Sequence, residues 1–129
     1  MVRDRNREGA VHEDIATGAV LPSLRPTVVL TNNRTGSVAE VFAAALQEYD
    51  VATVMGGTSN GCVGYTDVRE FGDGSSMAVT THVNLGPVSG TVLNGVGVVP
   101  DQQVARTSDD IAAARDPQLD AAVAYLSGG

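Results

Sequence analysis

Few side chains in this 129-residue sequence are suited to covalent or acid–base chemistry. Ser37 stands three residues before Glu40, the only cysteine is Cys62, and the two histidines are His12 and His82. A serine hydroxyl or a thiol can act as a nucleophile, and an imidazole can act as its base. Each residue also has an ordinary structural interpretation, so its surroundings in the sequence have to be weighed.

Ser37 and Glu40 have the spacing of a capping box, in which a serine and a glutamate three residues later satisfy unpaired amides at a helix start. That interpretation by itself explains both residues. A serine at a helix start also faces the positive end of the helix dipole, which stabilises a developing alkoxide or oxyanion. The local pattern therefore allows either a helix cap or a nucleophile.

Cys62 follows a glycine-rich loop, Gly56–Gly61, and is either a small loop residue or a thiol that serves as nucleophile or base. No histidine or cation stands near it in the sequence to favour the thiolate. His82 is either an ordinary strand residue or a base for Ser37, and His12 is expected in a solvated loop. The glycine-rich loop is not a phosphate cradle, because it lacks the lysine and the helix-opening Ser or Thr of a P-loop.

The composition excludes several classes of function. The net charge is −7 and the arginines are scattered, which argues against a nucleic-acid partner because phosphate binding needs clustered basic residues. No run approaches the roughly 18–20 consecutive apolar residues of a membrane span, and residues 1–8 are too polar for a secretory signal peptide. A single cysteine excludes an internal disulfide and a cysteine-based zinc cluster. No cofactor or metal is expected.

All 8 basic residues are arginines, so the sequence contains no lysine. Any mechanism that requires a lysine base therefore cannot be completed within these residues.

The patterns around Ser37 predict the elements that position it. Residues 26–31 are a continuous aliphatic run, typical of a strand buried on both faces. A turn at 32–36 leads into a helix that ends near Tyr49–Asp50, and residues 52–55 form a second buried strand. The predicted apolar face of the helix consists of Val38, Val41, Phe42, Ala45 and Leu46. Strand, helix and strand in this order predict a parallel β–α–β unit.

A hairpin is predicted after the glycine-rich loop. Residues 65–71 and 77–85 have strand character and are joined by the turn 72–75. Residues 91–93 are predicted as one more short strand, and residues 109–115 as a short helix.

The two ends of the chain differ in pattern. Asp116 at the cap and Pro117 at the first helical position predict a last helix. Its expected apolar face consists of Leu119, Ala122, Val123 and Leu126. Residues 1–25 are predicted as a poorly defined N-terminal strand and loop, and residues 26–129 as the core domain.

Four segments, in the right order, resemble the C-terminal processing (tail-specific) serine peptidases. Val28–Asn32, Ser37–Glu40 and Ala43–Gln47 are similar to the family's strand, its Ser-Ala-Ser-Glu nucleophile turn and its small-residue helix. Ala52–Gly56 resembles the strand that precedes the family's lysine loop.

The third segment resembles the family's Leu-x-Asp-Gly-Ser, Leu-Thr-Thr and Gly-Ile-x-Pro-Asp motifs. It consists of Phe71–Ser75, Val79–Thr81, Pro87 and Gly95–Asp101. The fourth, Asp116–Ala122, resembles the family's closing helix. The resemblance implies an α/β fold, a partial domain of the spiral core shared with the Clp-protease and crotonase folds.

The resemblance also implies roles for three residues. Ser37 falls on the nucleophile, Cys62 on the lysine base, and Thr66 on the glutamine that supports the lysine. Two of these positions depart from the family pattern. The glycine-rich turn that supplies an oxyanion-hole amide has no counterpart before residue 26, and no PDZ domain is found.

The implied function is a serine-type peptidase domain that acts on unfolded chains or C-terminal peptides, incomplete or catalytically impaired because lysine is absent. The alternative is a non-catalytic peptide-binding module, or one that forms a homo-oligomer through exposed strand edges. The family usually works outside the bacterial cytoplasm, but the sequence does not assign a compartment to this chain.

Overall fold

The computed structural model describes residues 1–18 and 25–128, which form two sheets and three helices. The first sheet is four-stranded and antiparallel, in the order β2-β1-β6-β5, and the second is three-stranded and parallel, in the order β3-β4-β7. The strands are β1 (Val2–Asn6), β2 (Val11–Asp14), β3 (Val28–Thr31), β4 (Thr53–Gly56), β5 (Gly64–Glu70), β6 (Ser76–Leu85) and β7 (Gln102–Gln103). The helices are α1 (Val38–Glu48), α2 (Ser108–Ala112) and α3 (Pro117–Ser127).

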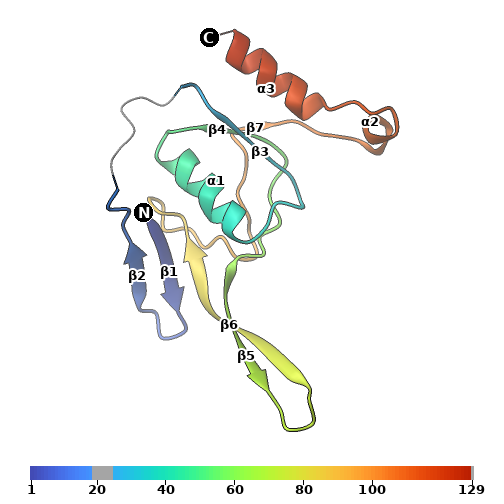
Figure 1. Cartoon of the computed structure of the whole chain (residues 1–129). Coiled ribbons are helices and arrows are strands. Elements are labelled where there is room, and N and C mark those ends of the chain that lie inside the picture. Colours follow the sequence, from blue (N-terminus) through green and yellow to red (C-terminus); the bar gives the residue numbers. More distant parts are fainter. Residues whose placement is uncertain (19–24, 129) are drawn as a thin grey trace.

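The parallel β–α–β unit is confirmed. β3 and β4 pair in parallel from Val28 and Thr53 to Thr31 and Gly56, and α1 connects them. The predicted hairpin of β5 and β6 is confirmed too, and Figure 1 shows it extending away from the rest of the chain, with α3 at the other end of the molecule. The α/β class with a C-terminal helix is therefore as the sequence predicts.

The apolar face predicted for α1 is correct at Val41 and wrong at Val38 and Phe42. The helix buries Glu40, Val41, Ala43 and Ala44, whereas Val38 is 76% and Phe42 59% exposed. The reason is that the small residues face the second sheet, where alanines allow the helix to approach closely. The core around this face contains Val41, Ala43, Ala44, Val54, Val63, Leu93 and Val98.

β3 is less buried than the sequence predicts. Val28 and Val29 are half-buried and Leu30 is exposed, so only Thr31 is buried. The strand lies at the end of its sheet, with β4 on one side only. An aliphatic run of this kind indicates a strand but does not say whether both of its faces are covered.

The N-terminal segment has more structure than a strand remnant. β1 and β2 form an antiparallel hairpin whose turn is closed by the Asn6 side chain, which accepts from the Ala10 amide at 2.8 Å, and Gly9 supplies the positive φ of +90°. β1 also pairs with β6. Residues 19–24 of the predicted N-terminal region lie outside the described residues.

The C-terminal helix begins as predicted, with the Asp116 side chain accepting from the Leu119 amide and Pro117 at the first position. Its buried residues, however, are Gln118 and Ala122. The other three predicted apolar positions, Leu119, Val123 and Leu126, are exposed. Gln118 donates to the Val104 carbonyl at 2.9 Å, so a polar contact fixes α3 beside the parallel sheet.

Two further features differ from or add to the sequence-based picture. The strand predicted at residues 91–93 is a single bridge between Val92 and Leu85. Among the described residues, no helix is both long and apolar enough to cross a membrane.

Candidate active site

Ser37 lies at the turn between β3 and α1 in a strained backbone conformation, with φ 58° and ψ −135°. A non-glycine residue rarely adopts a positive φ, and such strain is concentrated at functional sites. Its side chain makes no capping hydrogen bond, because the Glu40 amide donates instead to the Ser37 backbone carbonyl at 2.9 Å. The Glu40 half of the capping box is formed, since its carboxylate accepts from the Ser37 amide, but the exposed hydroxyl of Ser37 makes no capping hydrogen bond.

Glu40 is fully buried and joins the serine turn to the glycine-rich loop. Its carboxylate accepts from the Ser59 hydroxyl at 2.5 Å, from the Gly61 amide at 2.6 Å and from the Ser37 amide at 3.1 Å. The sequence predicts Glu40 as a helix cap, and the structure adds this second role. No sequence signal indicated it, because the acidic residue stands in a position expected to be outside the apolar face.

Cys62 is brought next to Ser37. The Ser37 amide donates to the Cys62 carbonyl at 2.9 Å, and the Cys62 side chain is exposed. The preceding Gly61 has a φ of +73° and lies so close to the Val96 backbone that a side chain would not fit. The loop can therefore pass close to the serine turn, which places Cys62 beside Ser37.

A cleft of about 330 Å³ opens at Ser37 between α1 and the antiparallel sheet. It is lined by Val2, Asp14, Ser37, Val38, Val41, Val63, Gly64, Tyr65 and Asn84. Asn84 is only 5% exposed. The cleft is thus mostly apolar, with a carboxylate, an amide and a phenol that could contact a peptide.

Thr66 does not line this cleft. It is exposed on β5 and pairs with Thr80, whereas the preceding residue, Tyr65, points into the cleft. Successive side chains of a strand point to opposite faces, so a difference of one residue decides which side chain reaches Ser37. Tyr65, Asp14 and Asn84 are site residues that the sequence did not single out.

The histidines lie beyond the cleft. His82 is half-buried, its Nδ1 is 3.1 Å from the Thr81 hydroxyl, and its ring packs edge-on against Tyr65 at 5.9 Å between centroids. It lines a neighbouring hollow of about 580 Å³ that shares only Tyr65 and Asp14 with the Ser37 cleft. His12 is exposed, with Nδ1 3.4 Å from Asp4. In the described part of the chain, no group of three His, Cys, Asp or Glu residues is arranged to hold a metal ion.

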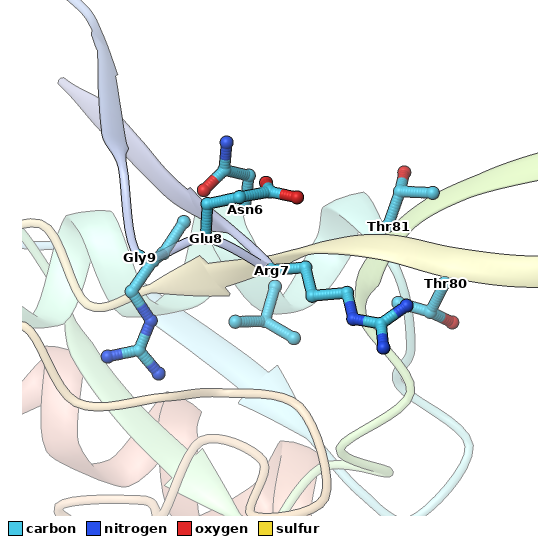
Figure 2. Close-up of a pocket in the computed structure, with 8 residues that line it drawn as sticks. Asn6, Arg7, Glu8, Gly9, Thr80 and Thr81 are labelled. Atoms are coloured by element: carbon cyan, nitrogen blue, oxygen red, sulfur yellow. The ribbon is translucent and has the colours of Figure 1, made fainter.

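Another hollow, of about 560 Å³, lies where the β1–β2 turn meets β6. Figure 2 shows Asn6, Arg7, Glu8 and Gly9 of the turn, with Thr80 and Thr81 of β6, around it. It shares no lining residue with the Ser37 cleft and contains no nucleophile activated by a base. It is therefore a surface feature of the hairpin and is not a second candidate active site.

Two further carboxylates hold segments together at the C-terminal end of α1. Asp101 accepts from the Val54 amide and from the Gln47 side chain, both at 2.8 Å. Glu48 accepts from the Val88 amide and from the Ser89 amide and hydroxyl. Burial raises the pKa of Glu48, but these hydrogen bonds and the charge of Arg3 outweigh it and lower the pKa overall.

A strand, a strained serine turn, a helix and a parallel second strand are the arrangement of a class of α/β serine peptidases, and comparison with solved structures supports this class. The chain superimposes on a peptidase from Parabacteroides merdae with a TM-score of 0.77 and 25% identity, over 97% of this chain and 42% of that one. It superimposes on the photosystem II D1 C-terminal processing protease with a TM-score of 0.67 and 34% identity, over 80% of this chain and 26% of that one. The tricorn protease shares the fold, with a TM-score of 0.71 at 22% identity.

Residues 1–104 match peptidase family S41, and the chain belongs to this family. It is 32% identical over 127 residues to the carboxyl-terminal-processing protease of Synechocystis, and the aligned region covers 96% of this chain and 29% of that protein. It is 36% identical over 104 residues to the carboxy-terminal processing protease CtpA of Bacillus subtilis, which covers 81% of this chain and 21% of that protein. The chain thus spans between about a fifth and three tenths of the length of these relatives.

Proposed function

We propose that this chain is the part of a C-terminal processing serine peptidase that carries the nucleophile, Ser37, in a catalytically impaired form. The observation that carries the proposal is the strained backbone at Ser37, with a hydroxyl free of the helix and facing a cleft. The start of α1 adds the first helix amides, which have no partner within the helix and suit a developing oxyanion. Names of relatives support a peptide substrate with a C-terminal cleavage site.

The impairment follows from the missing base. A serine hydroxyl is a weak nucleophile until a neighbouring group accepts its proton. The position that resembles the family's lysine holds Cys62, and the one that resembles its glutamine holds Thr66, which faces away from the cleft. Among the described residues that line the cleft, the ionisable groups are Asp14 and Tyr65. A full rate therefore requires a base from outside these 129 residues.

The alternative is a binding module that keeps the cleft without the chemistry. The exposed apolar side chains of Val38 and Phe42 beside the cleft favour it, because they offer surface to a peptide whether or not Ser37 reacts. The two proposals differ only in whether the Ser37 hydroxyl is activated.

Labelling with a fluorophosphonate, read by intact and peptide mass spectrometry, distinguishes them. We expect slow labelling confined to Ser37 in the wild-type chain and none in Ser37→Ala. A folded wild-type chain that never reacts would rule out intrinsic peptidase chemistry and leave the binding module.

A gain-of-function variant tests the position of the missing base. Because the Cys62 carbonyl accepts from the Ser37 amide, a lysine at position 62 starts beside the nucleophile. We expect Cys62→Lys to label roughly a hundredfold faster than the wild type, the usual contribution of a general base. Cys62→Met is the matched control, since it has a long side chain without an amine. Equal rates in the two variants would contradict the proposed correspondence of Cys62 with the lysine.

A further inference from the structure

The outer edge of β5 has no partner within the described part of the chain. β5 is the last strand of the antiparallel sheet, with β6 on its inner side, and all of its residues are exposed. Figure 1 shows that the hairpin carries this edge away from the body of the molecule. An exposed strand edge presents a row of free N–H and C=O groups that can pair with another strand.

The turn of the hairpin fixes which backbone groups face outward. The Phe71 amide donates to the Ser75 carbonyl at 2.9 Å, so the backbone groups of Phe71 point toward β6. Backbone groups alternate in direction along an antiparallel strand. Those of Thr66, Val68 and Glu70 consequently point outward and are available to a further strand.

The side chains along this edge are complementary to those of the same strand in a second copy of the chain. If two copies of β5 pair antiparallel about Val68, Asp67 of each copy lies opposite Arg69 of the other. The same register places Tyr65 opposite Phe71, and both rings are half exposed. Opposite charges and aromatic rings directly across an antiparallel pair stabilise it.

Neighbouring registers lack this complementarity. Pairing about Asp67 places that carboxylate opposite itself, and pairing about Arg69 places two guanidinium groups together. Like charges directly opposite each other destabilise a strand pair. The charges therefore select the register about Val68.

We propose that the partner of this edge is a second copy of the chain. Two copies of Tyr65–Phe71 pair antiparallel across a two-fold axis at Val68 and join the two four-stranded sheets into one continuous sheet. The interface is isologous, as in most homodimers, and it does not depend on whether Ser37 is activated.

Charge reversal tests the register directly. Asp67→Arg places like charges at both Asp67–Arg69 contacts, and Arg69→Asp does the same with the opposite sign. We expect each single variant to dimerise at least about tenfold more weakly than the wild type in sedimentation equilibrium, since two favourable pairs become two unfavourable ones. The double variant restores opposite charges and is expected to recover wild-type dimerisation. An equimolar mixture of the two single variants is expected to form a heterodimer for the same reason.

Val68→Pro provides a second test that leaves the hairpin intact. The Val68 amide points outward, so its loss removes a hydrogen bond at the two-fold axis without breaking the ladder to β6, and proline is tolerated at such edge positions. We expect a monomer with an unchanged far-UV circular dichroism spectrum. The wild-type chain is also measured at about 100-fold the concentration used for the variants, so that weak dimerisation is detected. If the wild-type chain is still monomeric at that concentration, the proposal is overturned. A dimer that responds to neither charge reversal nor proline would overturn it as well.

Discussion

At the scale of single residues, a glutamate with no exposed surface connects the two segments that form the candidate site. Glu40 accepts hydrogen bonds from Ser37 at the helix start and from Ser59 and Gly61 in the loop before Cys62. A buried carboxylate is stable only when such donors surround it. The spacing between Ser37 and Cys62 is therefore set by a third side chain that takes no part in the chemistry.

Glu40→Gln is expected to lower the free energy of unfolding by about 2 kcal/mol, because one of the oxygens becomes an amide group that cannot accept from a backbone N–H. Urea denaturation measures the change. Glu8→Gln is the matched control, since Glu8 is exposed and should shift the stability by less than about 0.5 kcal/mol. Equal effects of the two substitutions would show that the buried network is not specific to a carboxylate.

At the scale of elements, local signals were sufficient for some features and not for others. The bounds of α1 and the start of α3 were predictable because a cap and a periodic run are properties of neighbouring residues. The buried face of α1 was not, since it depends on which side meets the sheet. β7 was missed because it consists of two glutamines, Gln102 and Gln103, whose pairing with β4 is decided by the chain around them.

The same distinction applies to the candidate site. Ser37 and Cys62 could be singled out from the resemblance to the family, and the structure shows them in backbone contact. Tyr65 reaches the cleft and Thr66 does not line it. This difference depends on the side to which each strand residue points, which the sequence alone did not fix. The burial of Asn84 likewise results from the pairing of β1 and β6.

The end of β4 contains a second tight contact that predicts a difference between two glycines. Gly56 has a φ of +119°, and a side chain there would overlap the Thr31 carbonyl, whereas Gly95 has a φ of +79° and open space around it. Gly95→Ala is expected to cost about 1–2 kcal/mol from backbone strain alone. Gly56→Ala should cost at least about 2 kcal/mol more because β3 and β4 must separate. Thermal unfolding of both variants checks this order, and a milder effect at Gly56 would contradict it.

The hydrogen bonds at the start of α2 predict that the stability of this helix depends on pH. Hydrogen bonds from the Thr107 side chain and amide, and then from Arg115, lower the pKa of Asp110 to about 2. Because the folded pKa lies below the ordinary value of 3.8, the stabilisation is complete above pH 4 and is lost as the pH falls toward 2. Carboxyl NMR titration should give a midpoint near 2, and Asp110→Asn should lose helical structure in α2 already at neutral pH. A midpoint near 4 would show that the Thr107 contacts do not form in solution.

At the scale of the whole molecule, Asp101 joins three parts of the chain. Its carboxylate binds Val54 in β4 and Gln47 in α1, and it stands directly before β7, which leads to α2 and α3. The C-terminal segment that follows Asp101 is attached to the core through this residue, the short pairing of β7 and the contacts of α3.

Asp101→Ala is expected to reduce the stability by roughly 1–3 kcal/mol, because the Val54 amide loses its acceptor. Hydrogen exchange should accelerate first in β7 and at Val54, while the β5–β6 hairpin keeps its protection. Asp101→Asn retains one acceptor oxygen, so its stability is expected to lie between those of the wild type and of Asp101→Ala. Uniform acceleration throughout the chain would mean that the C-terminal segment unfolds together with the core.

The backbone angle of Ser37 has a consequence for how this chain can change over time. A residue at φ 58° and ψ −135° costs about 1–3 kcal/mol unless it is glycine. A substitution at position 37 that relieves this strain and raises the stability therefore replaces the serine. Glycine would relax the turn, but it has no hydroxyl. A Ser37→Gly chain would be more stable but would have no candidate nucleophile, so stability and reactivity oppose each other at this one position.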